Sequence, residues 1–289
     1  MKAVVYCKLP QAGLGNQLLI LMKAYLYAHL NNLDVTVYNY YHPTIGPYLR
    51  RERIKRNYKN YFTFKKGLLQ DLVCRWIILK KKNQNLIINP SMVHNNANVS
   101  VLFNEMPHWS DFFKELKTHR QIVIDNLFSI IHPDILQKYN QMESPEIGLH
   151  VRMGDFRVLK PGEDFAKVGA VRTPEYYFID VIKKIRHAFN SELSVTVFTD
   201  GFKDNLKGVF SLPNIHMALP DTDIGDLLHL SKSKIIVSSA GSTFSYWAGF
   251  LSNGALILHP DHIHKQIRLE NDFFEGTVED FIISALKIK

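Results

Sequence analysis

The sequence predicts an α/β protein with two Rossmann-like domains that face a central cleft. Short apolar strands alternate with helical segments in both halves of the chain, which is the pattern of parallel, doubly wound sheets. The run Glu143-Ser144-Pro145 interrupts this alternation, so we expect an N-terminal domain over residues 1–144 and a C-terminal domain over residues 145–289. The 46% hydrophobic and 21% charged content is that of a globular protein.

The N-terminal half opens as strand, glycine-rich turn, helix and strand. Apolar residues at helical spacing follow the turn. A second, amphipathic helix ends in three lysines, where positive charge suits the helix dipole. An asparagine-rich loop comes next, and a further strand and a short helix complete this half. The expected elements are a strand at 3–9, a helix at 17–31, a strand at 35–40, a helix at 68–82, a loop at 83–101, a strand at 121–125 and a helix from His132.

The C-terminal half shows the same alternation more clearly. A polar loop follows its first strand, and Thr173-Pro174-Glu175 is a strong helix start. Thr277, with Asp280 three residues later, is expected to cap the last helix. The expected strands are 146–151, 194–198, 234–238 and 255–259, and the expected helices are 173–189, 221–230, 243–251 and one that begins after Thr277.

The glycine-rich turn near the N-terminus resembles a dinucleotide-binding turn only in part. Leu18 stands where the third glycine would be, and the second strand ends in Asn39-Tyr40 without an acidic ribose ligand, which disfavours an NAD-dependent oxidoreductase. The turn fits either a backbone lying close to a ligand or to the facing domain, or a tight turn with a helix cap. Its candidate cleft residues are Gly13, Gly15, Asn16 and Gln17.

Two features of the C-terminal half point to an anion. His150 and Arg152 alternate onto one face at the end of a strand, and the carboxyl ends of parallel strands are where open α/β sheets bind ligands. The planar fork of an arginine suits phosphate or carboxylate, although Arg152 could instead pair with Asp155. The turn before the helix that starts at Thr243 offers free N–H groups and hydroxyls, or a plain cap. Together these groups could hold a diphosphate without metal.

Motifs for metal or hydrolytic chemistry are weak. Asp221-Thr222-Asp223 lies at a helix start, where it fits capping by Asp223, a metal, or contact with a ligand base or ribose. Asp261-His262-Ile263-His264 is an isolated metal candidate, and no His-Glu-x-x-His spacing occurs. The absence of a nucleophile elbow and of a P-loop disfavours hydrolases and nucleotide phosphatases. We therefore assign no metal ligand and no cofactor.

Net charge and cysteine content limit which partners and which cellular compartment are plausible for this chain. The net charge of +8 suits an anionic ligand, an acidic membrane surface or nucleic acid. The segment 50–66 has eight Lys/Arg with interleaved aromatics, which fits RNA, anionic lipid, an acidic acceptor or a solvated face. The apolar face of helix 68–82 fits burial or membrane contact. Two cysteines, no secretory signal and no apolar run of ~20 residues predict a cytoplasmic protein, either free or peripheral to a membrane.

Five motifs occur in a characteristic order between residues 13 and 251. They are Gly13-Leu14-Gly15-Asn16-Gln17-Leu18, His150-Val151-Arg152-Met153-Gly154-Asp155, Phe198-Thr199-Asp200, Asp226-Leu227-x-x-Leu230-Ser231 and Ser242-Thr243-Phe244-Ser245-Tyr246-Trp247-Ala248. In this order the motifs resemble those of the α-1,2-fucosyltransferases of glycosyltransferase family 11. The sequence departs from the usual family pattern at Met153, Gly241 and Tyr246, where Arg, Asn and Trp are common.

The resemblance implies a GT-B fold, GDP-fucose as the donor, inversion at the anomeric carbon and no required metal. It further implies that the chain is a galactoside 2-α-L-fucosyltransferase acting on a galactose-containing oligosaccharide or lipid-linked glycan, such as a lipopolysaccharide O-antigen, and has no nucleic-acid partner. Arg152 would contact the donor diphosphate, and His150 would lie by the nucleotide. The other donor-site residues implied are Asp200, Asp226, Ser242, Thr243 and Phe244.

The expected reaction displaces GDP from the sugar by an acceptor hydroxyl. Arg152 would stabilise the leaving group, and Asp155 is our candidate for the base, with Glu163 and Asp164 as alternatives. A transferase using another nucleotide-sugar and a non-enzymatic nucleotide- or RNA-binding protein are the alternative functions. Selective binding of GDP rather than RNA would distinguish the enzyme from the binding protein.

Overall fold

A computed structural model describes residues 3–40, 49, 58, 60–64, 67–81, 86–92, 99–264, 266–269 and 273–287. The chain forms two compact units. The first combines Met1–Thr44 with Asn57–Leu136, and the second contains Gln137–Lys289. Each unit has its own parallel sheet.

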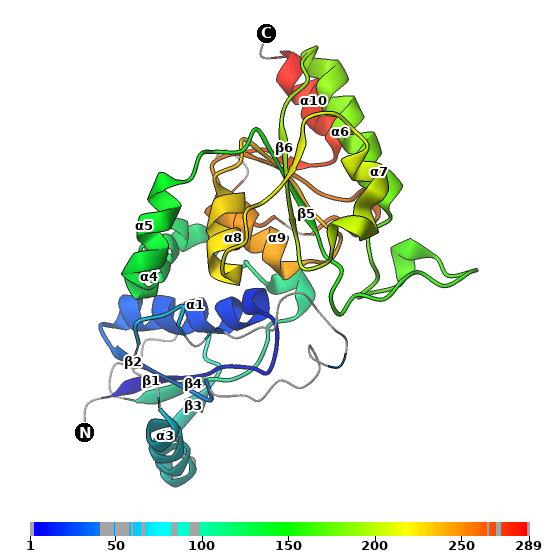
Figure 1. The fold of residues 1–289 in the computed structure, drawn as a ribbon. Coiled ribbons are helices and arrows are strands. Elements are labelled where there is room, and N and C mark those ends of the chain that lie inside the picture. The colour runs from blue at the N-terminus through cyan, green and yellow to red at the C-terminus, as the bar shows by residue number, and fades with distance from the viewer. Residues whose placement is uncertain are drawn as a thin grey trace. The chain divides into compact units, whose positions relative to one another are not determined.

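The first unit is built on a four-stranded parallel sheet in the order β2-β1-β4-β3. Helices α1 and α3 cover opposite faces of this sheet (Figure 1), and α4 packs against α1. Cys7 and Cys74 are both buried as free thiols. The elements are β1 (Val4–Lys8), α1 (Leu14–Asn31), β2 (Asp34–Tyr38), α3 (Leu68–Lys81), β3 (Leu86–Ile88), β4 (Ser100–Phe103), α4 (Arg120–Ile130) and α5 (Pro133–Gln141), the last continuing into the second unit.

Two expectations for the first unit are wrong. The segment 83–101, expected to be a loop, contains β3 and the start of β4, and β3 has only three residues, too few to show a period. The segment 121–125, expected to be a strand, lies inside α4. Its β-branched residues suggest a strand, but Val123, Leu127 and Ile130 recur at helical spacing and are buried together. Packing of that helical face therefore overrides local propensity.

The aromatic residues of segment 50–66 belong to the core of the first unit. Tyr58, Tyr61 and Phe62 are buried, and Phe62 stacks on Phe64 with ring centroids 5.3 Å apart. Phe62 also forms a bridge to Ile131. The eight Lys/Arg of the segment lie outside the described residues. The buried rings are not available to stack on nucleic-acid bases, so the RNA interpretation loses its aromatic component.

The second unit is built on a six-stranded parallel sheet in the order β10-β9-β8-β5-β6-β7. Numbered within the unit, this is the 3-2-1-4-5-6 order of dinucleotide-binding sheets, and its topological switch point lies between β5 and β8. The elements are β5 (Ile147–Val151), α6 (Glu175–Phe189), β6 (Val195–Thr199), α7 (Lys207–Phe210), β7 (Ile215–Met217), α8 (Asp223–Ser231), β8 (Ile235–Val237), α9 (Thr243–Leu251), β9 (Ala255–Ile257), β10 (Glu275–Gly276) and α10 (Val278–Lys287).

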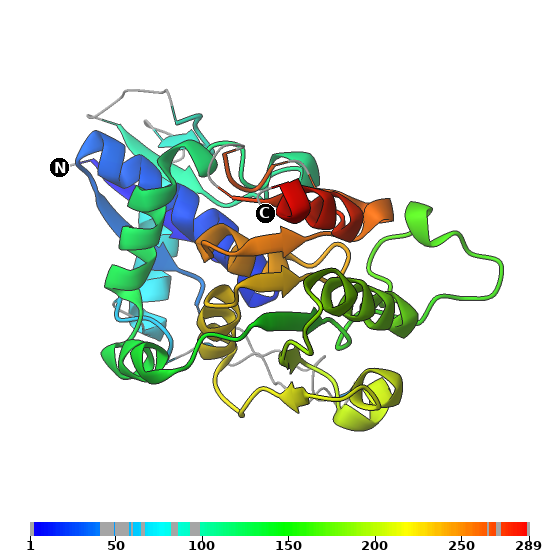
Figure 2. The same ribbon diagram turned by 90° about the horizontal axis from the view of Figure 1, so that it is seen from above.

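Helices cover both faces of this second sheet, with α6 and α10 on one face and α8 and α9 on the other (Figures 1 and 2). Ile147, Leu149 and Val151 of β5 point into the α6–α10 core. By alternation, Gly148 and His150 point to the α8–α9 face. A Cβ atom at Gly148 would lie 2.1 Å from Ser233 Oγ, so only glycine lets the end of α8 approach β5 this closely.

Local details of the second unit differ from expectation at several points. Elements α7, β7 and β10 are too short for sequence periodicity to reveal. Pro174, and not Thr173, occupies the cap position of α6. Thr222 caps α8 instead of Asp223, because its Oγ1 accepts a hydrogen bond from Gly225 N–H at 3.1 Å. The capping of α10 by Thr277 is confirmed by a 3.2 Å bond from Asp280 N–H.

Candidate functional site

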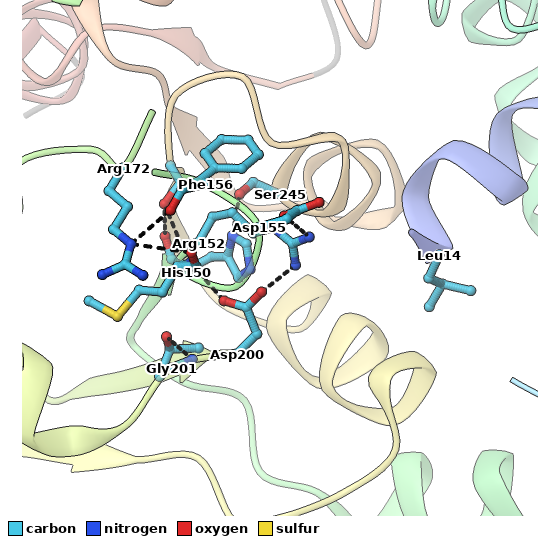
Figure 3. Close-up of polar contacts among 12 residues, drawn as sticks. Leu14, His150, Arg152, Asp155, Phe156, Arg172, Asp200, Gly201 and Ser245 are labelled. Atoms are coloured by element: carbon cyan, nitrogen blue, oxygen red, sulfur yellow. Dashed lines mark hydrogen bonds and ion pairs between the residues drawn. The ribbon is translucent and has the colours of Figure 1, made fainter. Parts of the chain in front are cut away.

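The side chain of Arg152 lies just beyond the carboxyl end of β5, between two carboxylates (Figure 3). Its Nη1 donates to Asp200 Oδ2 at 2.5 Å, and its Nη2 donates to Asp155 Oδ1 at 2.6 Å. A guanidinium has five N–H groups, so these bonds leave three for a ligand. The side chain of Arg152 is 19% exposed, against 9% for Asp200 and 38% for Asp155. The sequence left a pair with Asp155 open as an alternative to a ligand, but it gave no sign of Asp200 as the more buried partner of Arg152.

Asp200, at the end of β6, holds the strand end of β5 as well as the arginine. Its Oδ1 accepts a hydrogen bond from Met153 N–H at 2.7 Å, while Oδ2 accepts from Arg152. Gly201, the next residue, lets Met153 pack closely, because a Cβ there would be 2.4 Å from the Met153 sulfur. Asp200 was expected in the nucleotide site, and the structure gives it a positioning role toward Arg152.

Ser239 joins the two strands at the switch point. Its hydroxyl accepts a hydrogen bond from Arg152 N–H and donates to the His150 carbonyl oxygen, both at 2.8 Å. Ser239 follows β8 and is fully buried. One hydroxyl therefore fixes the backbone of Arg152 against the turn that leads into α9. The sequence carries no local signal for this bond from Ser239 across to β5.

His150 is buried on the α8–α9 face of the sheet. Its Nδ1 lies 2.7 Å from Ser245 Oγ, and its ring stacks on Phe244 with centroids 4.8 Å apart. Burial lowers the pKa of His150 to about 3, with Asp200 raising it and Arg152 lowering it further. The ring is therefore neutral at physiological pH, and it ties β5 to the first turn of α9 (Figure 3).

The start of α9 is an N-terminus without a side-chain cap. Ser242 stands at the cap position with an extended backbone, but its hydroxyl makes no capping bond, contrary to the plain-cap interpretation. Ser242 is buried, and Thr243 and Phe244 are half-buried. Backbone N–H groups at such a helix start carry partial positive charge and favour an anion. Ser239 bonds to the Arg152 backbone N–H and His150 bonds to Ser245 of α9, so β5 and this turn are held together, and their predicted partnership in binding a diphosphate stays a prediction.

The residues that depart from the family pattern have structural roles. Gly241 N–H donates to Tyr246 Oη at 3.1 Å, and Gly241 has a φ of +66°, so the two departures form one contact. A tryptophan at 246 would offer no acceptor there. Met153 is buried beneath Gly201. Nearby, Arg172 Nε donates to the Met153 and Phe156 carbonyl oxygens at 3.2 and 2.8 Å, which clamps the turn that carries Asp155.

The remaining acidic candidates lie on α8, which packs against α9. Asp226 is in the first turn of α8 and half-buried, and Asp223 is buried beside it. Asp221 Oδ1 accepts a hydrogen bond from Thr222 N–H at 2.7 Å. Within the described residues, no group of three or more His, Cys, Asp or Glu side chains is placed to hold a metal ion.

The predicted cleft residues at Gly13–Gln17 lie in the first unit. Helix α1 starts at Leu14, three residues earlier than expected, with Gly13 at the cap position. Leu14 N–H donates to Tyr58 Oη at 3.0 Å. The Gln17 amide nitrogen bonds to the carbonyl oxygens of Pro10 and Ala12, so it stabilises its own turn. The turn leaves open space beside Gly13, and Gly15 is buried within α1.

The sequence and the fold match known proteins. The model of the family "Glycosyl transferase family 11" matches residues 91–259. No curated protein sequence matches the chain. The crystal structure of the fucosyltransferase NodZ from Bradyrhizobium superposes with a TM-score of 0.55 at 13% identity, covering 91% of this chain and 97% of that one.

Two further structures of the NodZ α-1,6-fucosyltransferase are similar. The form soaked with GDP-fucose has a TM-score of 0.53 at 13% identity, and the form co-crystallised with GDP has a TM-score of 0.53 at 14% identity. Each comparison covers 89% of this chain and 95% of that one. At this identity the likeness establishes the fold, which is of the GT-B type.

Proposed function

The chain belongs to glycosyl transferase family 11, and from this premise we propose that it transfers L-fucose from GDP-fucose to a glycan hydroxyl with inversion at the anomeric carbon. We further propose O2 of a galactoside as the position fucosylated, which would make the chain a galactoside 2-α-L-fucosyltransferase. The proposed acceptor is an oligosaccharide or lipid-linked glycan such as a lipopolysaccharide O-antigen, modified in the cytoplasm at the inner face of the membrane.

The observation that carries this proposal is the convergence of Arg152 and the start of α9 at the switch point of the second sheet. Both lie at the carboxyl ends of neighbouring strands, β5 and β8, where sheets of this order bind nucleotides. Three N–H groups of Arg152 and the N–H groups of α9 offer positive charge to a diphosphate. The proposal needs no metal, because these groups supply the charge that a cation would otherwise provide.

In the proposed reaction, the acceptor oxygen attacks C1 of fucose and the bond from C1 to GDP breaks. GDP leaves with the electron pair, and a base takes the acceptor proton. Because negative charge grows on the leaving phosphate, donors already aimed at it stabilise the transition state more than the ground state. One such preorganised donor is worth about 3–4 kcal/mol, or about 10²–10³ in rate.

Asp155 is the carboxylate best placed to serve as the base. Glu163 is held by Arg157, with N–O distances of 2.5 and 2.8 Å, and by Lys160 N–H. Asp164 accepts from Ala166 N–H and pairs with Lys167. Asp155 is bound to Arg152 itself and is far more exposed than Asp200. A donor diphosphate would therefore compete with Asp155 for the guanidinium and release its carboxylate toward the acceptor.

The test is to incubate the full chain with a panel of nucleotide-sugars, measure release of the nucleoside diphosphate, and then add candidate galactosides. We expect turnover with GDP-fucose alone and a product whose glycosidic bond is α-1,2. Asp155→Asn should reduce transfer by about 10²-fold or more while GDP binding persists. Turnover with a different nucleotide-sugar, or tight binding of RNA without any turnover, would refute the proposed function.

A further inference from the structure

Helix α3 of the first unit has one buried face and one exposed apolar face. Asp71, Cys74 and Ile78 are buried, and the latter two pack on the sheet with Tyr6, Tyr38 and Leu102. The sequence left burial and membrane contact open for the apolar face of this helix, and the structure leaves that face exposed. The exposed side chains of α3, with their exposed fractions, are Leu68 (69%), Leu69 (80%), Leu72 (62%), Val73 (54%), Trp76 (56%) and Leu79 (68%).

These six side chains form one continuous surface, which we call the α3 apolar face. At 3.6 residues per turn, successive residues are rotated by about 100°, so the six fall within an arc of about 140°. Arg75 lies just outside one margin of this arc, Lys80 lies inside it close to the other margin, and both are exposed. Lys80 Nζ lies 3.7 Å from the centre of the Trp76 ring. Contiguous exposed apolar surface of this kind marks an interaction site.

The exposed charged residues of α3 itself are all positive. Asp71 is the only acidic residue of α3, and it is buried, where it accepts a hydrogen bond from Asn39 N–H at 3.1 Å. Arg75 reaches Asn39 Oδ1 at 2.5 Å, and Lys81 reaches Ser100 Oγ at 2.7 Å. The face therefore presents leucines and a tryptophan bordered by cations, with no exposed carboxylate on the helix.

This combination fits one occupant, an anionic phospholipid surface. Interfacial helices place Leu and Trp at the acyl boundary while Lys and Arg meet anionic headgroups. The fourteen residues of α3 span about 21 Å, too short to cross a bilayer, and no described helix meets the length and hydropathy of a membrane span. A second copy of the same face would bring Arg75 and Lys80 toward like charges, which opposes self-association.

We propose that the α3 apolar face docks the protein onto an anionic phospholipid bilayer, with α3 lying in the plane of the interface. The inference rests on the first unit alone and does not depend on the proposed reaction.

Co-sedimentation of the full chain with vesicles tests this docking. We expect binding to vesicles of equal parts phosphatidylglycerol and phosphatidylcholine, weaker binding to pure phosphatidylcholine, and loss of binding as salt rises. The double variant Leu69→Glu/Trp76→Glu should bind at least about tenfold more weakly. Leu219→Glu, at a leucine 83% exposed on the second unit, is the matched control and should bind as wild type.

Tryptophan fluorescence gives a second, independent measurement. Trp109 is 58% exposed and Trp247 is fully buried, so in a Trp109→Phe background a change on adding vesicles reports Trp76. We expect its emission to shift to shorter wavelength with the phosphatidylglycerol vesicles. Unchanged emission, or equal sedimentation of the double variant with unaltered circular dichroism, would overturn the proposal. The proposal would also fail if the wild-type protein forms a dimer that does not bind vesicles and the double variant is a monomer.

Discussion

Arg152 is fixed at three points at the end of β5, two on its guanidinium and one on its backbone. Asp200 and Asp155 hold its terminal nitrogens, and Ser239 holds its backbone N–H. An arginine that already sits in its working position loses little side-chain entropy when a ligand arrives. Preorganisation of this kind is what makes one cation effective against a developing charge.

Replacement of Arg152 should therefore affect turnover strongly. We expect Arg152→Ala to lower kcat/KM for GDP-fucose by about 10²–10³, and Arg152→Lys to recover only part of this loss because an ammonium lacks the planar fork. Steady-state GDP release measures both. Thermal unfolding of each variant checks that loss of the ion pair to Asp200 has not unfolded the unit. Turnover of Arg152→Ala within threefold of wild type would remove Arg152 from the mechanism.

The neutral state of His150 predicts a pH dependence of stability. The folded pKa, about 3, lies below the ordinary value of 6.5, so the unfolded chain binds the extra proton between these values. The stability contributed by neutral His150 is complete above pH 6.5 and is lost as the pH falls toward about 3. Urea unfolding at several pH values should show a smaller loss for His150→Gln than for wild type. If the unfolding free energy of both proteins falls equally with pH, His150 does not titrate as described.

At the scale of elements, the site depends on how closely β5, β8 and the helices of one face approach. Gly148 allows α8 to pack on β5, and His150, two residues on, then reaches Ser245 of α9. Leu149 and Val151 between and beyond them anchor the strand in the opposite core. Core residues and site residues thus alternate along one strand. A substitution that shifts the packing of β5 therefore also moves the site residues that it carries.

Gly148→Ala tests this coupling. The new methyl group would lie 2.1 Å from Ser233 Oγ and 2.7 Å from Leu230 Cδ1, so the strand or helix must shift. We expect a loss of about 1–3 kcal/mol of unfolding free energy together with weaker GDP binding, measured by urea denaturation and calorimetry. Gly169→Ala, where a Cβ meets nothing within 4 Å, is the control and should change stability by no more than about 0.5 kcal/mol. Equal effects of the two variants would contradict this explanation.

At the scale of the whole molecule, the elements that we propose to bind the donor all come from the second unit. A ligand that binds only the folded state stabilises it, by about 2.7 kcal/mol at one hundred times its Kd. GDP should therefore raise the thermal midpoint and slow hydrogen exchange at residues 147–155 and 239–251. UDP should do so less, and Arg152→Ala should weaken both effects. If GDP slows hydrogen exchange only at residues 3–40, the nucleotide binds the first unit, which would contradict the proposed site.

Much of the architecture could be predicted from local sequence. Strands such as 147–151 and helices such as 243–251 are long and periodic enough to be recognised in the sequence, and the structure places both close to expectation. The short elements β3, β7, α7 and β10 lack that length. The error at 121–125 has another cause, because burial of one helical face decided between two conformations that local propensity left close.

The candidate site could also be predicted only in part from local sequence. Arg152, His150 and the turn before Thr243 could be chosen from residue type and position at a strand end, because parallel strands bring their carboxyl ends to one edge. Asp200 as the buried partner of Arg152, and Ser239 as the link between β5 and β8, could not be chosen this way. Their bonds join residues 48 and 87 positions apart, and no local pattern encodes such a pairing.

The exposed face of α3 is another feature that local sequence could not predict. Sequence periodicity correctly gave an amphipathic helix, but it could not tell which stripe the sheet would cover. The structure buries Asp71, Cys74 and Ile78 and leaves the leucines outside. By itself the sequence determined the alternation of strands and helices, the family and the residue types at the strand ends, since these depend on local spacing. Only tertiary structure decided which carboxylate pairs with Arg152, which hydroxyl joins the strands and which face of α3 meets solvent, because each depends on contacts between distant parts of the chain.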